Sequence, residues 1–330
     1  GLAGAYLLGW LLQAAIQLPS LKRTGFVFHP SLSLRSEGMK KVFALMGPVM
    51  VSTWVQPINL VINSRFGSRL YDGGGVSVLE YSTNLYLVIA GTFILSVTNV
   101  IFPRLSRMAA GERQGELEDA LRTSLHGTLF FVLPMAAGLM LLSRPLISFL
   151  YGGGQFDGQS VALTSSALTW LSLGMVGYAV QNILSRAYFA RQKGMAPLVA
   201  GACSIGANLL LCALLVEPLG IVGLALSSAV SSTVYALLLM IPMQREHVVD
   251  GGLLRDLGKM LLCTLLMAAA VWAVRGGLGL HLPAGKAGEL LLMAACALAG
   301  CAVYFTAAAL VDLPEGRLLR QLAARLGKRG

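Results

Sequence analysis

The sequence contains little charge and few of the residues from which soluble catalytic sites are built. Charged residues make up 12% of the 330 residues and apolar residues 56%, whereas a soluble domain contains about 25% charged residues. A soluble fold of this length would leave much apolar surface in water, but a bilayer accepts such surface on the outside of every helix. The composition therefore predicts an integral membrane protein.

Ionisable and metal-binding residues are also scarce within the apolar runs. No Asp, Glu, Lys or Arg stands in the middle of any run, so a proton relay through buried carboxylates finds no support. The histidines and cysteines show no metal-ligand spacing, and the glycine clusters at 73–75 and 152–154 lack the Lys and Ser/Thr of a phosphate loop. These absences predict a protein that is not an enzyme and needs no cofactor.

Several apolar runs are about 20 residues long, the length at which a helix crosses the hydrocarbon core. Helices are expected because each backbone group must be satisfied within its own segment. We therefore predict an all-α polytopic membrane protein with about nine transmembrane helices. The expected spans are 1–18, 43–64, 76–102, 124–142, 160–184, 197–216, 219–243, 257–274 and 288–311.

The distribution of the basic residues follows this segmentation. The net charge of +10 is therefore explained by membrane topology, and we expect no nucleic-acid partner. Alternate connectors place 20 of the 25 Lys and Arg residues on one side of the membrane and five on the other. Because basic loops resist translocation, the richer side is expected to be cytoplasmic, together with the basic C-terminus. The first span then begins outside, which predicts a truncated sequence that lacks upstream helices.

Amides and hydroxyls are the polar groups that do occur within the spans. Asn59 and Asn63 share one helix face with Gln56, and Tyr81, Asn84 and Asn99 follow roughly one stripe of the next span. Two interpretations remain open. The amides bond neighbouring helices, at about 1 kcal/mol each, or they line a hydrated cavity between helix bundles.

Several motifs resemble one family of lipid transporters. Residues 8–13 (LGWLLQ) with 17–19 (QLP), and residues 99–107 (NVIFPRLSR), are similar to two helices of the MviN/MurJ lipid II flippases, which belong to the MATE-like exporters. Further similarity follows at 150–156, 184–192 and 197. The order and spacing of these motifs cover nearly the whole chain.

The resemblance implies a domain organisation. The family has fourteen helices, and the nine expected here correspond to the sixth to fourteenth, a MATE-like bundle that lacks most of the N-lobe. On this mapping residues 1–18 form the last helix of the N-lobe and 19–41 a cytoplasmic loop. Residues 42–243 form a six-helix C-lobe, and 244–330 contain two additional helices and a basic tail.

The resemblance also implies a function. The protein would flip lipid II, a peptidoglycan precursor on undecaprenyl pyrophosphate, across the bacterial cytoplasmic membrane by alternating access. We expect a monomer among membrane lipids. The expected substrate cavity contains Asn59, Asn63, Tyr81, Asn84 and Asn99, and Asn84 stands where the family often has an arginine.

The energy source stays open between sodium and the membrane potential. Family members with a sodium site use carboxylates and amides, and the approximate matches here are Asn63, Asn208, Cys212 and Ser228. No carboxylate is among them, which disfavours a hard cation. We retain Asn63, Asn208 and Ser228 as a candidate cation site.

Three alternatives remain open. A MATE-type drug exporter or a flippase for polysaccharide-linked lipids would share the fold. An enzyme acting on polyprenyl phosphates should show clustered carboxylates or histidines near one membrane face, and the sequence contains no such cluster. A purely structural scaffold would not need amides along a helix face.

Overall fold

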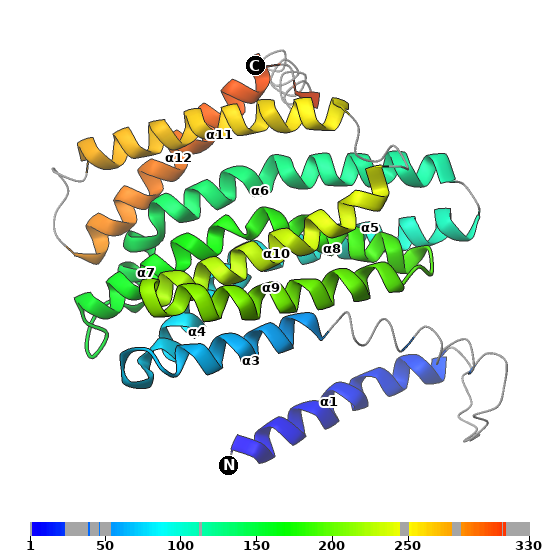
Figure 1. Ribbon diagram of the computed structural model, residues 1–330, viewed down its shortest axis with the longest axis horizontal. Helices are drawn as coiled ribbons and strands as arrows, with labels where there is room; N and C mark the ends of the chain where they lie inside the picture. Colours follow the sequence, from blue (N-terminus) through cyan, green and yellow to red (C-terminus); the bar gives the residue numbers. More distant parts are fainter. Residues whose placement is uncertain are drawn as a thin grey trace. The chain divides into compact units, whose positions relative to one another are not determined.

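The computed structural model describes residues 2–23, 39, 46, 54–111, 114–244, 251–278, 285–311 and 313–314, and these are almost entirely helical (Figure 1). The chain divides into two compact units, residues 1–44 and residues 45–330. In the first unit, α1 (Leu2–Arg23) covers the first expected span. Most of the expected loop at 19–41, the start of the expected span at 43–64 and the tail at 315–330 lie outside the described residues.

Six described segments are long and apolar enough to cross a membrane. They are Tyr71–Ala109, Gly115–Tyr151, Met195–Leu219, Ile221–Met243, Gly251–Leu278 and Lys286–Leu310. The bent pair Gly158–Leu173 and Met175–Ala190 adds a seventh if it forms one broken span. Between 22% and 50% of the most apolar part of each of the six is buried, which leaves at least half of it available to lipid. The predicted all-α polytopic membrane fold is confirmed.

The predicted count of nine spans is wrong for the described residues. Seven expected spans coincide with the segments above, but α1 does not meet the same criteria of length and apolarity. In the second expected span only 13 residues form a described helix, α3 (Val55–Gly67). Thirteen residues rise about 20 Å, less than the roughly 30 Å thickness of the hydrocarbon core.

The second unit is a bundle whose successive long segments run in alternating directions (Figure 1). After α3 come η1 (Tyr71–Gly73), α4 (Gly74–Tyr86), η2 (Leu87–Gly91), α5 (Thr92–Ala110), α6 (Gln114–Tyr151), α7 (Gly158–Leu173), α8 (Met175–Ala190), α9 (Met195–Leu219), α10 (Ile221–Gln244), α11 (Gly251–Leu278) and α12 (Lys286–Leu310). Short connections force neighbouring helices to pack side by side. Between α9 and α10 the chain reverses at Gly220, whose φ of 57° is costly for other residues.

The broken span α7–α8 packs closely on α10. The two helices meet at Gly174 with a bend of 45°. The Ser232 hydroxyl donates to the Gly174 carbonyl oxygen at 3.2 Å, which provides that oxygen with a partner at the bend. One turn later, a Cβ at Gly177 would lie 2.8 Å from both N and Cα of Thr233. Only glycine permits this approach of the two backbones.

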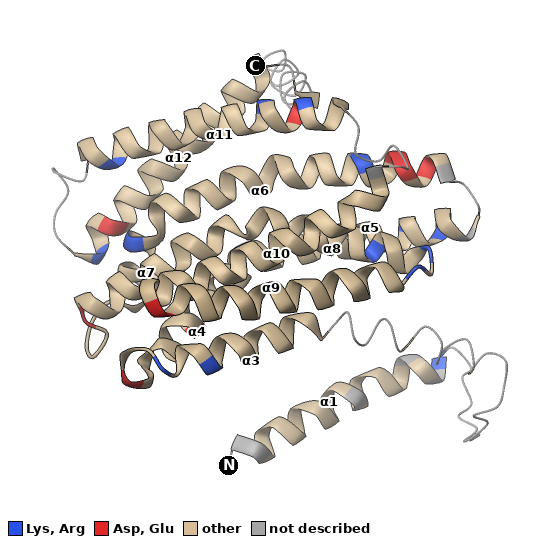
Figure 2. Ribbon diagram, in the orientation of Figure 1, with Lys and Arg blue, Asp and Glu red and all other residues tan. Residues whose placement is uncertain are grey.

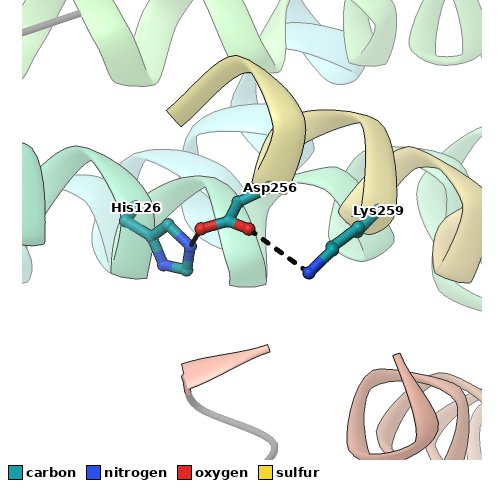
Figure 3. Close-up of polar contacts among 3 residues, drawn as sticks. All are labelled: His126, Asp256 and Lys259. Atoms are coloured by element: carbon teal, nitrogen blue, oxygen red, sulfur yellow. Dashed lines mark hydrogen bonds and ion pairs between the residues drawn. The ribbon is translucent and has the colours of Figure 1, made fainter. Parts of the chain in front are cut away.

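The pair α11–α12 packs on α6, through a surface that we call the α6 seam. The seam is mainly apolar, with buried Met260, Cys263, Met267, Val271 and Tyr304 against Leu129, Phe130 and Leu133. Polar contacts anchor it at both ends of α11. Asp256 lies 3.2 Å from Nε2 of His126 and 3.7 Å from Nζ of Lys259 (Figure 3), and Arg275 donates to the Leu141 carbonyl oxygen at 2.6 Å.

Lys and Arg residues gather near the two ends of the second unit (Figure 2). By their positions in the sequence of helices, the residues at the end where α5, α8 and α10 finish and α6 and α11 begin are Arg104, Arg107, Arg122, Arg186, Arg191, Lys193, Arg255 and Lys259. The opposite end, where α3, α6 and α11 finish and α12 begins, has Arg65, Arg69, Arg144, Arg275 and Lys286. The first end is therefore the more basic of the two among the described residues.

Candidate functional site: an uncharged polar cavity

The second unit contains a cavity of about 420 Å³ between α3, α4, α7, α8, α9 and α10. No Lys, Arg, Asp or Glu is among its described lining residues, and its polar groups are amides, hydroxyls and phenols. These polar lining residues are Gln56, Asn59, Asn63, Thr83, Tyr86, Tyr178, Gln181, Ser204, Ser228 and Ser232. The cavity can therefore form hydrogen bonds with a ligand without adding a charge.

Asn63 joins three helices at one side of the cavity. Its Nδ2 donates to Oγ of Ser228 on α10 at 2.8 Å, and its Oδ1 accepts from Nδ2 of Asn208 on α9 at 3.1 Å. The Cys212 thiol lies 3.6 Å from the same Oδ1. Asn63, Asn208 and Cys212 are buried, and Ser228 is partly buried. We call these four residues the Asn63 cluster, which ties the short helix α3 to the bundle.

Two other lining amides lack such partners. Oε1 of Gln181 and Oδ1 of Asn59 are buried, and neither accepts a hydrogen bond from any residue that the structure describes. The Gln181 side chain comes from α8 and is 6% exposed, while Asn59 comes from α3 on a different wall. A buried acceptor without a donor is costly, and in native proteins such groups commonly mark a ligand or water position.

Two irregular helical turns border the cavity. The π-helical turn η2 interrupts the span that begins with α4, and its first residue, Leu87, lines the cavity. The break between α7 and α8 lies at Gly174, which also lines it. π-Helical turns occur frequently at functional sites, and broken helices are common around the binding sites of transporters. The cavity is thus bordered by the helical segments best suited to local movement.

The Asn63 cluster does not have the donor set that a sodium ion prefers. Its oxygen donors are neutral, Oδ1 of Asn63 already accepts from Asn208, and the thiol of Cys212 is a soft ligand. No carboxylate belongs to the cluster. The candidate cation residues Asn63, Asn208 and Ser228 do come together, but as a neutral hydrogen-bonded group.

The other predicted site residues occupy different places. Asn59 and Asn63 line the cavity, whereas Tyr81, Asn84 and Asn99 are not among its lining residues and are exposed on α4 and α5. Tyr81 packs against Tyr151 and Phe156, with ring centroids 4.9 Å and 5.5 Å away. A substrate role for Tyr81, Asn84 and Asn99 stays a prediction.

The prediction missed several polar lining residues. Thr83 and Tyr86 on α4 lie three apart, as do Tyr178 and Gln181 on α8, so each pair shares a helix face. This spacing could have identified a polar face on each of the two helices. It could not have shown that both faces line one cavity with α3, because α8 lies far from α3 and α4 along the chain.

Comparison with known proteins identifies sequence relatives of the chain. Residues 1–280 match the sequence model of the family described as lipid II flippase MurJ. A protein of Haemophilus influenzae described as a probable lipid II flippase MurJ is 32% identical over 279 residues, 82% of this chain and 54% of that protein. The lipid II flippase MurJ of Burkholderia cenocepacia is 28% identical over 311 residues, 92% of this chain and 60% of that protein. The chain spans about half the length of the curated relatives it matches.

Solved structures share the architecture. One described as lipid II flippase MurJ in an inward closed conformation has a TM-score of 0.70 at 24% identity, over 92% of this chain and 60% of that one. A crystal structure of a MATE protein in complex with MaL6 has a TM-score of 0.54 at 17% identity, over 84% of this chain and 65% of that one. At these identities the likeness concerns the fold.

Proposed function

Because the chain belongs to the family of the lipid II flippase MurJ, we propose that it forms part of a transporter that flips lipid II across the bacterial cytoplasmic membrane. The substrate would be the lipid-linked peptidoglycan precursor, which moves from the cytoplasmic to the outer face without being hydrolysed. The protein would act as a transporter and not as an enzyme, with no cofactor. We propose a monomer among membrane lipids, with its basic C-terminus in the cytoplasm.

The single observation of the structure that carries this proposal is an uncharged cavity, with amides and hydroxyls in its lining, in a bundle of helices apolar enough to cross a membrane. A glycopeptide head group cannot cross hydrocarbon alone, since each unsatisfied polar group costs several kcal/mol there. Amides and hydroxyls along the path replace the lost water contacts. A carboxylate, which would favour a cationic drug, is absent from the described lining, so the drug-exporter alternative has less support.

Movement is required because the cavity must open to one face at a time. The π-helical turn η2 and the bend at Gly174 lie on the cavity wall, where small changes of helix direction would alter access. The more basic end of the second unit would face the cytoplasm, in accord with the positive-inside rule. Alternating access would then proceed by bending of α4–α5 and α7–α8 around the more regular helices.

The membrane potential is the proposed source of energy. The head group is anionic, and the cytoplasmic face is electrically negative, so outward movement of each negative charge gains about 2.3 kcal/mol per 100 mV. Sodium has less support because the Asn63 cluster offers a hard cation only neutral oxygens and a thiol.

Depletion of the protein in its host tests the proposal. Lipid II should accumulate. The fraction of lipid II that reacts with a membrane-impermeant reagent applied outside intact spheroplasts should fall at least tenfold. Re-expression of the natural protein should restore that fraction. The variant Ser96→Ala, altered on an exposed part of α5 away from the cavity lining, serves as a matched control and should restore it equally. An unchanged sidedness of lipid II after depletion would refute the proposed function.

A further inference from the structure

The cavity has a chemical preference that the proposed function does not by itself specify. Its described lining contains no cation, while the pyrophosphate of a lipid-linked precursor is multiply ionised. Burial of such an anion without a paired cation is strongly unfavourable. The pyrophosphate is therefore a poor ligand for this cavity.

The unpartnered amide oxygens indicate which groups would fit. Oε1 of Gln181 and Oδ1 of Asn59 are acceptors that require N–H or O–H donors. An ionised pyrophosphate has none to offer, whereas sugar hydroxyls, N-acetyl groups and peptide amides supply many. Thr83 adds a hydroxyl to the lining, whereas the hydroxyls of Ser204 and Ser228 already bond to the carbonyl oxygens of Ser231 and Leu224.

The size of the cavity is also informative. At about 420 Å³ it falls at the lower part of the range of about 300–1,000 Å³ for small-molecule pockets. A cavity of this size admits one part of a large head group, not all of it. Tyr86 and Tyr178, whose rings pack 5.9 Å apart, give it an apolar wall next to the amides.

We propose that this cavity binds the neutral glycan or peptide part of the lipid-linked head group, through Gln181 and Asn59, and leaves the pyrophosphate elsewhere. This inference rests on the proposed function and deepens it. It assigns Gln181 and Asn59 to substrate binding and treats the Asn63 cluster as the support that holds α3, and with it Asn59, in the bundle.

The test measures binding of two probes to the purified protein as the host makes it. One probe is the disaccharide-pentapeptide without lipid or pyrophosphate, and the other is undecaprenyl pyrophosphate. Gln181→Leu and Asn59→Leu should each weaken binding of the disaccharide-pentapeptide about tenfold, as expected for one lost buried hydrogen bond. Binding of undecaprenyl pyrophosphate should not change.

Asn182→Leu provides a matched control on the neighbouring position of α8. Asn182 donates to the Tyr178 carbonyl oxygen of its own helix at 2.8 Å and does not line the cavity, so neither probe should lose affinity. In the absence of ligand, Gln181→Leu should leave the melting temperature unchanged or raise it, since it removes an unpartnered buried acceptor. Asn59→Leu, at a less buried position on a different helix, keeps the test decisive if Gln181→Leu folds poorly.

Three results would overturn the inference. They are no binding of the disaccharide-pentapeptide to the natural protein, equal binding in the cavity variants, or a loss that appears only with undecaprenyl pyrophosphate. If any of these occurred while depletion still trapped lipid II inside the cell, the inference would fail and the proposed function would stand. Unchanged lipid II sidedness after depletion would instead remove the proposed function, whatever the binding result.

Discussion

The cavity and the α6 seam are built from the same kinds of apolar helices but differ in how their polar groups are satisfied. At the seam, Tyr304 donates to the Phe130 carbonyl oxygen at 2.5 Å, and the ends of α11 are anchored through Asp256 and Arg275. At the cavity, Gln181 and Asn59 each leave an oxygen without a donor from the described residues.

This difference separates a surface that holds helices together from one that receives a ligand. A satisfied apolar contact has one favourable arrangement and resists change, because close-packed side chains do not deform continuously. Unpartnered amides and broken helices are unfavourable for stability alone and are commonly retained where function requires them. Substitutions at the two places should therefore alter different properties.

Tyr304→Ala should produce the largest loss of stability. The side chain is 2% exposed and lies in the seam, so its truncation leaves a cavity and should cost about 3–5 kcal/mol. Thermal unfolding of the purified variant measures this loss. The molecules that remain folded should bind the disaccharide-pentapeptide with natural affinity. Weakened binding by the folded fraction would contradict the separation of helix packing at the seam from ligand binding at the cavity.

Gly177→Ala should have a smaller effect, because it forces α8 away from α10 at the cavity wall. The added Cβ would lie 2.8 Å from backbone atoms of Thr233, an overpacking that should cost about 1–3 kcal/mol. Gly138→Ala in α6 is the control, since a Cβ there meets nothing within 4 Å. A melting temperature for Gly177→Ala equal to that of Gly138→Ala would show that the approach of α8 and α10 is less close.

Asn63→Asp tests the electrical character of the Asn63 cluster. The change supplies an anionic oxygen between Asn208, Cys212 and Ser228. Sodium at ten times its dissociation constant should then raise the free energy of unfolding of the variant by about 1.4 kcal/mol. The natural protein should melt at one temperature in sodium and in potassium at equal ionic strength. Specific stabilisation of the natural protein by sodium would contradict the proposed role of the membrane potential.

Asp157→Ala should have the smallest effect, at the start of α7 and away from both regions. The backbone N–H of Ser160 donates to the Asp157 carboxylate at 2.8 Å, and this bond lowers the pKa of Asp157 below its ordinary value. Its contribution is therefore present above the ordinary value of about 3.9 and is lost as the pH falls through the lowered pKa. Hydrogen exchange of the first turn of α7 should be faster in the variant at neutral pH. If the difference in exchange rate between the variant and the natural protein did not narrow on acidification, the Asp157 carboxylate would be excluded as its cause.

The fold could be predicted from the sequence to a large extent, since hydropathy and charge act locally. Seven expected spans coincide with described segments because each apolar run determines its own helix. The π-helical turn at Leu87–Gly91 was not predicted, because neither proline nor a charge marks it. Gly174 gives only a weak signal of a bend, since isolated glycines are frequent in membrane helices.

The site was less predictable because its parts come from separate helices. Asn59 and Asn63 share a face through their spacing, which is visible in the sequence. Gln181 is one of many polar residues in the spans, and only its place in the lining of a cavity shared with α3 and α10 distinguishes it. The association of Asn63 with Asn208 and Ser228 followed from family resemblance and not from any local pattern.

Photocrosslinking at two matched threonines tests the central claim most directly. Thr83 lines the cavity on α4, and Thr264 is buried in α11, one turn after Met260 of the α6 seam. With a photoreactive amino acid at each position in cells, the cavity position should capture the lipid-linked precursor and the seam position should not. Capture at position 264 but not at position 83 would contradict the account.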